Sequence, residues 1–247
     1  LDFRLYECAR KRNEEFRKTA GRFVSTVAVM TVKRAVSRGA ALIRASGKKA
    51  LNFLRATTAD QALPSGAFTR EFALRRLQRQ EWNFDEGLCR ALAGLFRGDA
   101  VMEFGGGVGL YAEFLRKEGM SCACYDGIPD IERITNGKVL HLDLSRRAEL
   151  DRKADWVLAL EVGEHIPRQF ESTFIENVDR YNTHGCVLSW AVPGQGGDGH
   201  VNCRPPDYIK GLFSRLGYQN DAAWEETLRK AATLPWFKNS LHVFRRK

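Results

Sequence analysis

The chain has 247 residues, of which 44% are hydrophobic, and this is enough for one sizeable α/β core with an appendage. The longest apolar run near the N-terminus, residues 23–32, is about half as long as a bilayer-crossing helix and argues against a transmembrane span there. The six cysteines include no Cys-x-x-Cys pair, so free thiols in a reducing compartment are expected.

The net charge of +9 is concentrated in one segment. Residues 16–59 contain ten lysines and arginines but no aspartate or glutamate, and the rest of the chain carries 29 basic against 30 acidic residues. A nearly neutral body argues against a nucleic-acid groove built into the core. The same distribution favours an N-terminal arm that binds an anionic partner.

Within this arm, apolar residues recur in steps of three and four, which places them on one face of a helix. They are Phe16, Ala20, Phe23, Val27 and Met30. We therefore expect residues 1–79 to form a basic, mostly helical extension that attaches through residues 16–55 to an anionic surface or a larger protein complex. The acid-poor, Arg-, Ala- and Ser-rich composition is typical of organellar transit peptides and favours a plastid or mitochondrial location at a membrane surface. The alternative is a cytoplasmic protein with a solvated basic tail.

After a turn at residues 64–66, helical and strand-like stretches alternate. The pattern predicts helices over residues 83–96, 110–118, 168–181 and 206–216, and strands over 100–104, 121–125, 139–142, 156–160, 186–191 and 241–246. Alternation at this spacing indicates βαβ units and a mainly parallel sheet that helices cover on both faces.

The stretch VMEFGGGVG, residues 101–109, is a short apolar strand that runs into a glycine turn and opens a helix. Ligands of open α/β sheets lie at the carboxyl ends of the strands, so a nucleotide-like ligand is expected at this turn. The spacing is acid-x-Gly-x-Gly-x-Gly from Glu103 to Gly109, which differs from the Gly-x-Gly-x-x-Gly of pyrophosphate binders. A tight turn without a ligand is the alternative.

Four predicted strands end at or next to a carboxylate: Glu103, Asp126, Asp143 and Glu161. Carboxylates suit a ligand that carries positive charge and no phosphate, and the glycine spacing disfavours a dinucleotide-dependent oxidoreductase. Individually, Asp143 could cap a helix and Asp126 could belong to a turn. Their joint occurrence in register favours a ligand site.

The stretch from about residue 81 to 246 resembles class I S-adenosylmethionine-dependent methyltransferases. The resemblance lies in the motifs above and in the run ADWVLALEVGEHIP at residues 154–167. The resemblance implies a seven-stranded, doubly wound, Rossmann-like sheet in a domain over residues 80–247, with S-adenosylmethionine as cofactor. The cofactor-binding residues that it implies are Glu103, Gly105, Gly107, Gly109, Asp126, Asp143, Leu144 and Glu161. Glu103 would approach the methionine ammonium through the turn, Asp126 would bind the ribose hydroxyls, and Asp143 and Leu144 would flank the adenine. Glu103 stands where many members have Asp.

Candidate catalytic residues follow the fourth and fifth strands. His165 comes just after the fourth strand, and His200 lies in a glycine-rich loop after the fifth. Either imidazole could assist deprotonation of an acceptor hydroxyl. A His165 satisfied within the core, without a chemical role, is the alternative.

The run Glu161, Glu164 and His165 also resembles the Glu-x-x-Glu-His of metal-dependent sugar 2′-O-methyltransferases of small RNAs and of ubiquinone-pathway O-methyltransferases. That resemblance implies a divalent ion such as Mg or Zn, with His200 as a further ligand. Many class I enzymes carry similar runs without a metal, so a metal-free site is the alternative.

The preferred function is therefore methyl transfer to an unidentified small-molecule acceptor. A structural or accessory subunit of an organellar, membrane-associated complex, attached by the basic arm, is the main alternative. An RNA methyltransferase is disfavoured because the nearly neutral body lacks a surface that follows phosphates.

Overall fold

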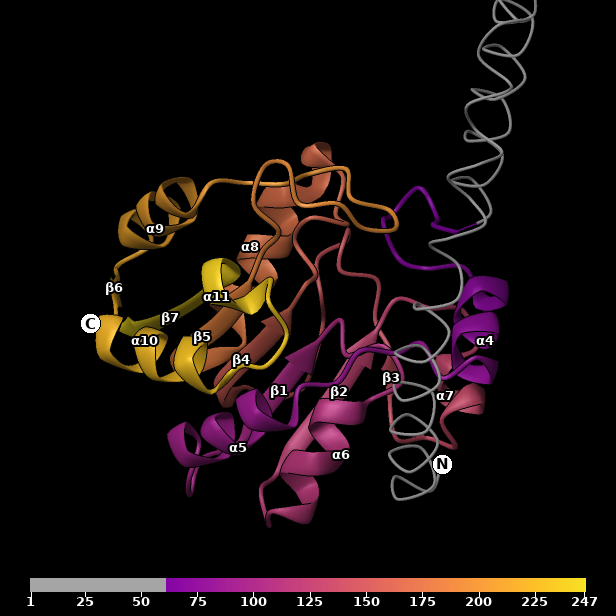
Figure 1. The fold of residues 1–247 in the computed structure, drawn as a ribbon, viewed down its shortest axis with the longest axis horizontal. Coiled ribbons are helices and arrows are strands. Elements are labelled where there is room, and N and C mark those ends of the chain that lie inside the picture. Colours follow the sequence, from indigo (N-terminus) through magenta and orange to yellow (C-terminus); the bar gives the residue numbers. More distant parts are fainter. Residues whose placement is uncertain (1–60) are drawn as a thin grey trace, which may run out of the picture.

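The computed structural model of the protein describes residues 61–247 (Figure 1). The expected arm at residues 16–55, its apolar face and most of the proposed 1–79 extension lie outside the described residues and stay predictions. Within the described range, no helix has the length and apolar character needed to cross a membrane. The predicted turn is present, because Gly66 N donates to Leu63 O at 2.9 Å and Leu63 N to Ala67 O at 2.7 Å.

A seven-stranded sheet with the order β3-β2-β1-β4-β5-β7-β6 forms the centre of the fold. The strands are β1 (Val101–Phe104), β2 (Cys122–Asp126), β3 (Leu140–His141), β4 (Ala154–Leu160), β5 (Asn182–Ser189), β6 (Tyr218–Asn220) and β7 (Leu241–Arg246). The first five strands pair in parallel, whereas β7 is antiparallel to both β5 and β6. The mainly parallel, doubly wound sheet predicted from the sequence is confirmed.

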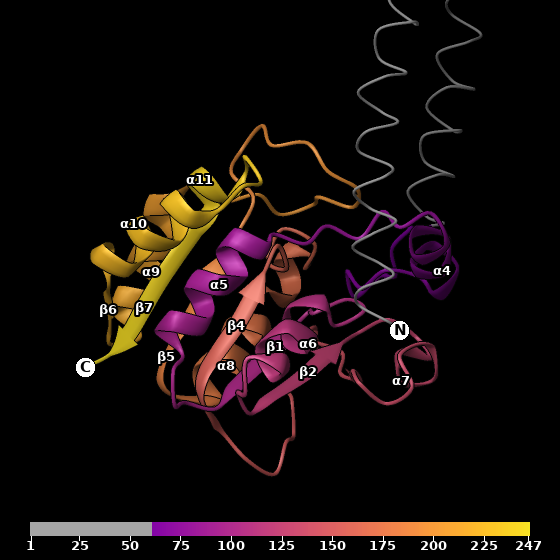
Figure 2. The same cartoon turned by 60° about the horizontal axis from the view of Figure 1, so that its bottom comes forward.

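Helices cover both faces of the sheet (Figures 1 and 2). They are α4 (Arg70–Gln78), α5 (Glu86–Leu95), α6 (Leu110–Lys117), α7 (Ile131–Ile134), α8 (Glu171–Arg180), α9 (Pro206–Arg215), α10 (Ala222–Ala231) and α11 (Phe237–Ser240), with a 3-10 turn at Arg168–Phe170. Residues of α5, α6 and α10 pack on one face of the strands, and those of α8 and α9 pack on the other. The buried strand β4 alternates accordingly: Trp156 and Leu158 face the first layer, and Val157 and Ala159 the second.

The predicted helix over 83–96 begins later, at Glu86, because Asp85 is its N-cap. The fully buried Asp85 carboxylate accepts from Leu88 N at 2.9 Å, and its other oxygen accepts from Thr233 N at 2.6 Å and Leu234 N at 2.7 Å. This one side chain therefore starts α5 and also fixes the segment that leads into α11.

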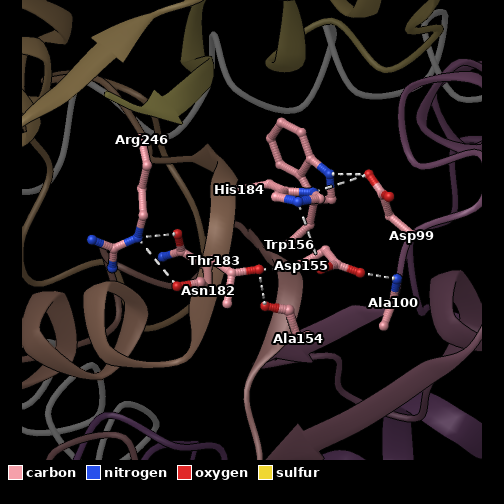
Figure 3. Close-up of polar contacts among 9 residues, drawn as sticks. All are labelled: Asp99, Ala100, Ala154, Asp155, Trp156, Asn182, Thr183, His184 and Arg246. Carbon is pink, nitrogen blue, oxygen red and sulfur yellow. Dashed lines mark hydrogen bonds and ion pairs between the residues drawn. The ribbon is translucent and has the colours of Figure 1, made fainter.

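Polar contacts join strands at the amino ends of the parallel strands, opposite the glycine turn (Figure 3). Trp156 Nε1 donates to Asp99 Oδ2 at 2.9 Å, and Ala100 N donates to Asp155 Oδ2 at 2.8 Å. His184 on β5 lies against both acids, 3.4 Å from Asp99 and 3.8 Å from Asp155. Because both acids already accept hydrogen bonds from the fold, we interpret this cluster as a structural link between β4, β5 and the start of β1.

Candidate active site

A cavity of about 400 Å³ opens at the carboxyl ends of the parallel strands. Its floor consists of the glycine turn after β1 and the residues that follow β2, β3 and β4. Its walls come from three other parts of the chain: residues 65–83, 195–200 and 236–237. This is the end of the sheet at which a ligand was predicted.

The glycine turn after β1 has a backbone that favours glycine at three positions. Gly105, Gly107 and Gly109 all adopt positive φ, at 72°, 58° and 83°. Gly105 N and Gly106 N both donate to Tyr125 O, at 2.8 and 3.1 Å, which holds the turn against β2. The backbone of the turn thereby faces the cavity without intervening side chains.

Glu103 lies directly beneath this turn and is 2% exposed. Its Oε2 accepts from Ala112 N in α6 at 3.0 Å and from the Cys124 thiol at 3.2 Å. Burial raises the pKa of Glu103 to about 7, although both hydrogen bonds oppose that shift. In the ligand-free protein this carboxyl is therefore half protonated near neutral pH.

The raised pKa of Glu103 predicts a pH dependence of stability. A carboxyl whose pKa is higher in the folded than in the unfolded state stabilises the fold most below about pH 4.5, and that contribution is lost as the pH rises through 7. A difference between 4.5 and about 7 corresponds to roughly 3 kcal/mol. Glu103→Gln stays neutral at every pH. Between pH 4 and pH 8 its free energy of unfolding should therefore rise by about that much relative to that of the wild type, measured by denaturant unfolding.

The exposed Glu118, at the end of α6, provides the control Glu118→Gln. Parallel pH profiles of wild type and Glu103→Gln would contradict the assignment.

Asp126 ends β2 and forms part of the cavity lining. Its Oδ2 accepts from Gly107 N at 2.7 Å and its Oδ1 from Ile128 N at 2.9 Å. Burial raises the pKa of this carboxyl, while these amides act in the opposite direction. Asp126 thus fixes the turn and presents a carboxylate beside it.

Asp143 and Leu144 also reach the cavity, two and three residues after β3. Asp143 Oδ1 accepts from Ser145 N at 3.0 Å and Ser145 Oγ at 2.7 Å, so the aspartate caps a turn while it lines the site. Leu144 is 5% exposed and supplies an apolar surface next to it.

Glu161 follows β4 with φ 54°, a left-handed conformation that is uncommon for a residue other than glycine. Its amide donates to Ser189 Oγ at 2.7 Å. Its carboxylate accepts from Gln195 Nε2 at 3.0 Å and from Ser240 Oγ at 3.2 Å. The strained backbone therefore aims Glu161 at the loop after β5.

His165 and His200 line the cavity, and one ligand atom from each lies within 4.8 Å of the other and of a Glu164 carboxylate oxygen. Glu164 is fully buried, and His200 Nε2 lies 4.0 Å from its Oε1. Within residues 61–247, neither carboxylate oxygen of Glu164 nor His165 Nδ1 has a hydrogen-bond partner. Three of the four predicted metal ligands are thus brought together, and the fourth, Glu161, is not part of that group although its side chain interacts with Glu164.

The protonation states of this cluster follow from its burial. Burial, followed by the charge of Glu161, raises the pKa of Glu164 well above its ordinary value. Burial, followed by the charges of His200 and Arg76, lowers the pKa of His165 to about 4. At neutral pH, His165 is therefore uncharged and able to accept a proton or bind a cation.

The wall formed by residues 65–83 was not assigned to the site from the sequence. Phe68 packs edge to face on His165 with ring centroids 5.0 Å apart, and Trp82 and Arg76 line the cavity beside it. Arg70, on α4, pairs with Asp130 at 3.1 Å, which fixes this wall next to α7.

No protein-family model matches the sequence, and no curated protein matches it. Solved structures do match. A TehB-like S-adenosylmethionine-dependent methyltransferase from Corynebacterium glutamicum covers 71% of this chain and 97% of its own, at 16% identity and a TM-score of 0.53. Magnesium protoporphyrin IX methyltransferase from Synechocystis, with bound S-adenosylhomocysteine, covers 65% of this chain and 80% of its own, at 17% identity and a TM-score of 0.50.

The strand order, the glycine turn after β1 and these neighbours define the class. The described part of the chain has the class I, Rossmann-like fold of S-adenosylmethionine-dependent methyltransferases. The fold implied by the sequence resemblance is therefore confirmed, and the roles of the individual site residues stay predictions.

Proposed function

We propose that the protein is an S-adenosylmethionine-dependent methyltransferase that acts on a hydroxyl group of a small molecule. The observation that carries this proposal is one continuous cavity whose two ends have different chemistry. One end contains the glycine turn and three strand-end acids, and the other contains His165 and His200. The small acceptor is further supported by the similar magnesium protoporphyrin IX methyltransferase.

The first end suits a ligand of the size and charge of the cofactor. Glu103 and Asp126 lie beneath and beside the turn, where they can receive an ammonium group and ribose hydroxyls, and Leu144 offers an apolar contact for an adenine. When bound, the cofactor supplies a methyl group activated by a sulfonium. The protein's remaining tasks are to orient the acceptor and to remove its proton.

His165 is the group best placed to take that proton. It lines the cavity and is uncharged at neutral pH, although burial lowers its pKa to about 4 and weakens it as a base. His200 Nδ1 lies 3.2 Å from Gln195 O, so an N–H there directs the Nε2 lone pair towards the Glu164 side of the cavity. Two imidazoles thus line the acceptor position, and the buried carboxyl of Glu164 lies 4.0 Å from one of them, at His200 Nε2.

The same cluster also fits a divalent cation. The buried Glu164 oxygens without partners and the unpaired His165 nitrogen are a mixed carboxylate and imidazole donor set, which suits Mg or Zn. Glu164, His165 and His200 would hold such an ion, which would lower the pKa of a bound hydroxyl.

The proposal is tested by binding of S-adenosylhomocysteine to the full chain, measured by calorimetry. We expect a one-to-one complex with a dissociation constant well below millimolar, since the turn and its acids are already formed. No detectable heat at millimolar ligand would refute the methyltransferase assignment.

The proposal also includes attachment to an anionic surface through residues 16–55 and a plastid or mitochondrial location. Only the charge distribution of the sequence supports these two points. An accessory role within a complex is favoured only by the acid-free arm. It would require the arm, and not the cavity, to be the functional feature.

A further inference from the structure

Arg76 contributes a positively charged side chain to the cavity wall, at the end where the acceptor is proposed to bind. Its guanidinium lies 5.6 Å from the Phe72 ring centroid and 5.7 Å from that of Trp82, and the side chain is 19% exposed. Nη2 donates to Glu81 O at 2.6 Å. The aromatic contacts and this backbone bond fix the guanidinium in place without neutralising its charge.

The carboxylate that pairs with Arg76 is poorly suited to be its permanent partner. Asp198 Oδ2 lies 3.2 Å from Arg76 Nη1, but Asp198 is 49% exposed and stands among Gly196, Gly197 and Gly199. A single contact between partly exposed groups contributes little stability. Within the described chain, Arg76 Nε has no acceptor at all. The protein itself thus satisfies Arg76 incompletely, and the contact of Nη1 with the exposed Asp198 is the one that a ligand can replace.

From this geometry we infer that Arg76 recognises an anionic group of the methyl acceptor, a carboxylate or a phosphate, which takes the place of Asp198. The inference rests on the proposed function, and it names the substrate class of the same site as an anionic hydroxy compound. Phe68 and Trp82 would then contact the acceptor's apolar part between Arg76 and His165.

The test uses the full chain, with benzoate and inorganic phosphate as anionic probes and benzamide as the neutral analogue of benzoate. Binding is measured by calorimetry with and without saturating S-adenosylhomocysteine. We expect at least one anion to bind saturably, and benzoate to bind about tenfold more tightly than benzamide. Arg76→Gln should weaken anion binding by about tenfold or more, whereas Asp198→Asn should strengthen it by removing the competing carboxylate.

Arg75→Gln is the matched control, because Arg75 is exposed on the same helix, carries the same charge and does not line the cavity. Anion binding that is absent from both wild type and Asp198→Asn, or that Arg75→Gln weakens as much as Arg76→Gln, would overturn the inference. If Arg76→Gln still binds S-adenosylhomocysteine, the variant is folded. If it does not fold, the effect of Asp198→Asn on anion binding decides whether the inference holds. If the wild type binds an anion but does not bind S-adenosylhomocysteine, the result would instead refute the proposed function.

Discussion

Replacing Gly105 with valine is expected to abolish binding of S-adenosylhomocysteine. Gly105 has φ 72°, and a Cβ there would lie 2.5 Å from Val162 Cγ2. A β-branched residue in this conformation is strained in its backbone and also collides with the residue after Glu161. The turn must shift, and the amides that face the cavity shift with it. Calorimetry at millimolar ligand should therefore detect no binding.

Two further variants separate this effect from general destabilisation. Gly98→Val places the same residue at φ 88°, with no atom within 4 Å of the added Cβ, and should bind the ligand like the wild type. Gly107→Ala is a milder change at the site, because its Cβ would lie 2.6 Å from Trp82 Cζ3, and it should weaken binding while the protein stays folded. A folded Gly105→Val protein with wild-type affinity would remove the cofactor assignment.

His165→Ala should lower turnover by a factor of about 100 to 10,000, the usual range for loss of a general base. The affinity for S-adenosylhomocysteine should change by less than about twofold, because His165 lies beyond the glycine turn. The measurement needs an acceptor, which a screen of hydroxybenzoates, sugar phosphates, phenols and amines can provide. His184→Ala, at the opposite end of the sheet, is the matched control and should leave turnover unchanged.

A chelator added to the wild type distinguishes the two chemistries that the cluster allows. If Glu164, His165 and His200 hold a divalent cation, the chelator and Glu164→Gln both lower turnover, and added Mg or Zn restores the chelated enzyme. If the imidazoles act without a metal ion, only the histidine variants lower turnover. Turnover that is insensitive to His165→Ala and to the chelator would contradict both versions.

Much of the sheet was predictable because three inner strands, β1, β2 and β4, are short apolar runs that end at or next to glycine or an acid. The strand at Leu241–Arg246 was predicted with its observed bounds. The edge strand β6 has only three residues and just one buried side chain, Tyr218, so it carries no periodic signal. Helix α10 was missed although half of its ten residues are apolar and Asp221 caps it through Trp224 N at 3.1 Å.

The floor of the site was predictable for a related reason. Glu103, the glycines and Asp126 are positioned by the local transition from strand to turn, which sequence spacing records. Arg76 and Asp198 meet only through tertiary structure, 122 positions apart. No spacing rule brings such residues together, and the acceptor wall was therefore missing from the sequence-based site.

The contact between Cys124 and Glu103 also bears on how the protein would tolerate a reactive ligand. Thiolates are strong nucleophiles towards alkylating agents, and a sulfonium methyl donor is one. Burial, followed by the charge of Glu103, raises the pKa of Cys124 well above its ordinary value, so the sulfur stays a protonated thiol that donates to the carboxyl. The cysteine beneath the glycine turn is thereby kept in its unreactive form, so that a sulfonium methyl donor bound at the turn would meet a thiol and not a thiolate.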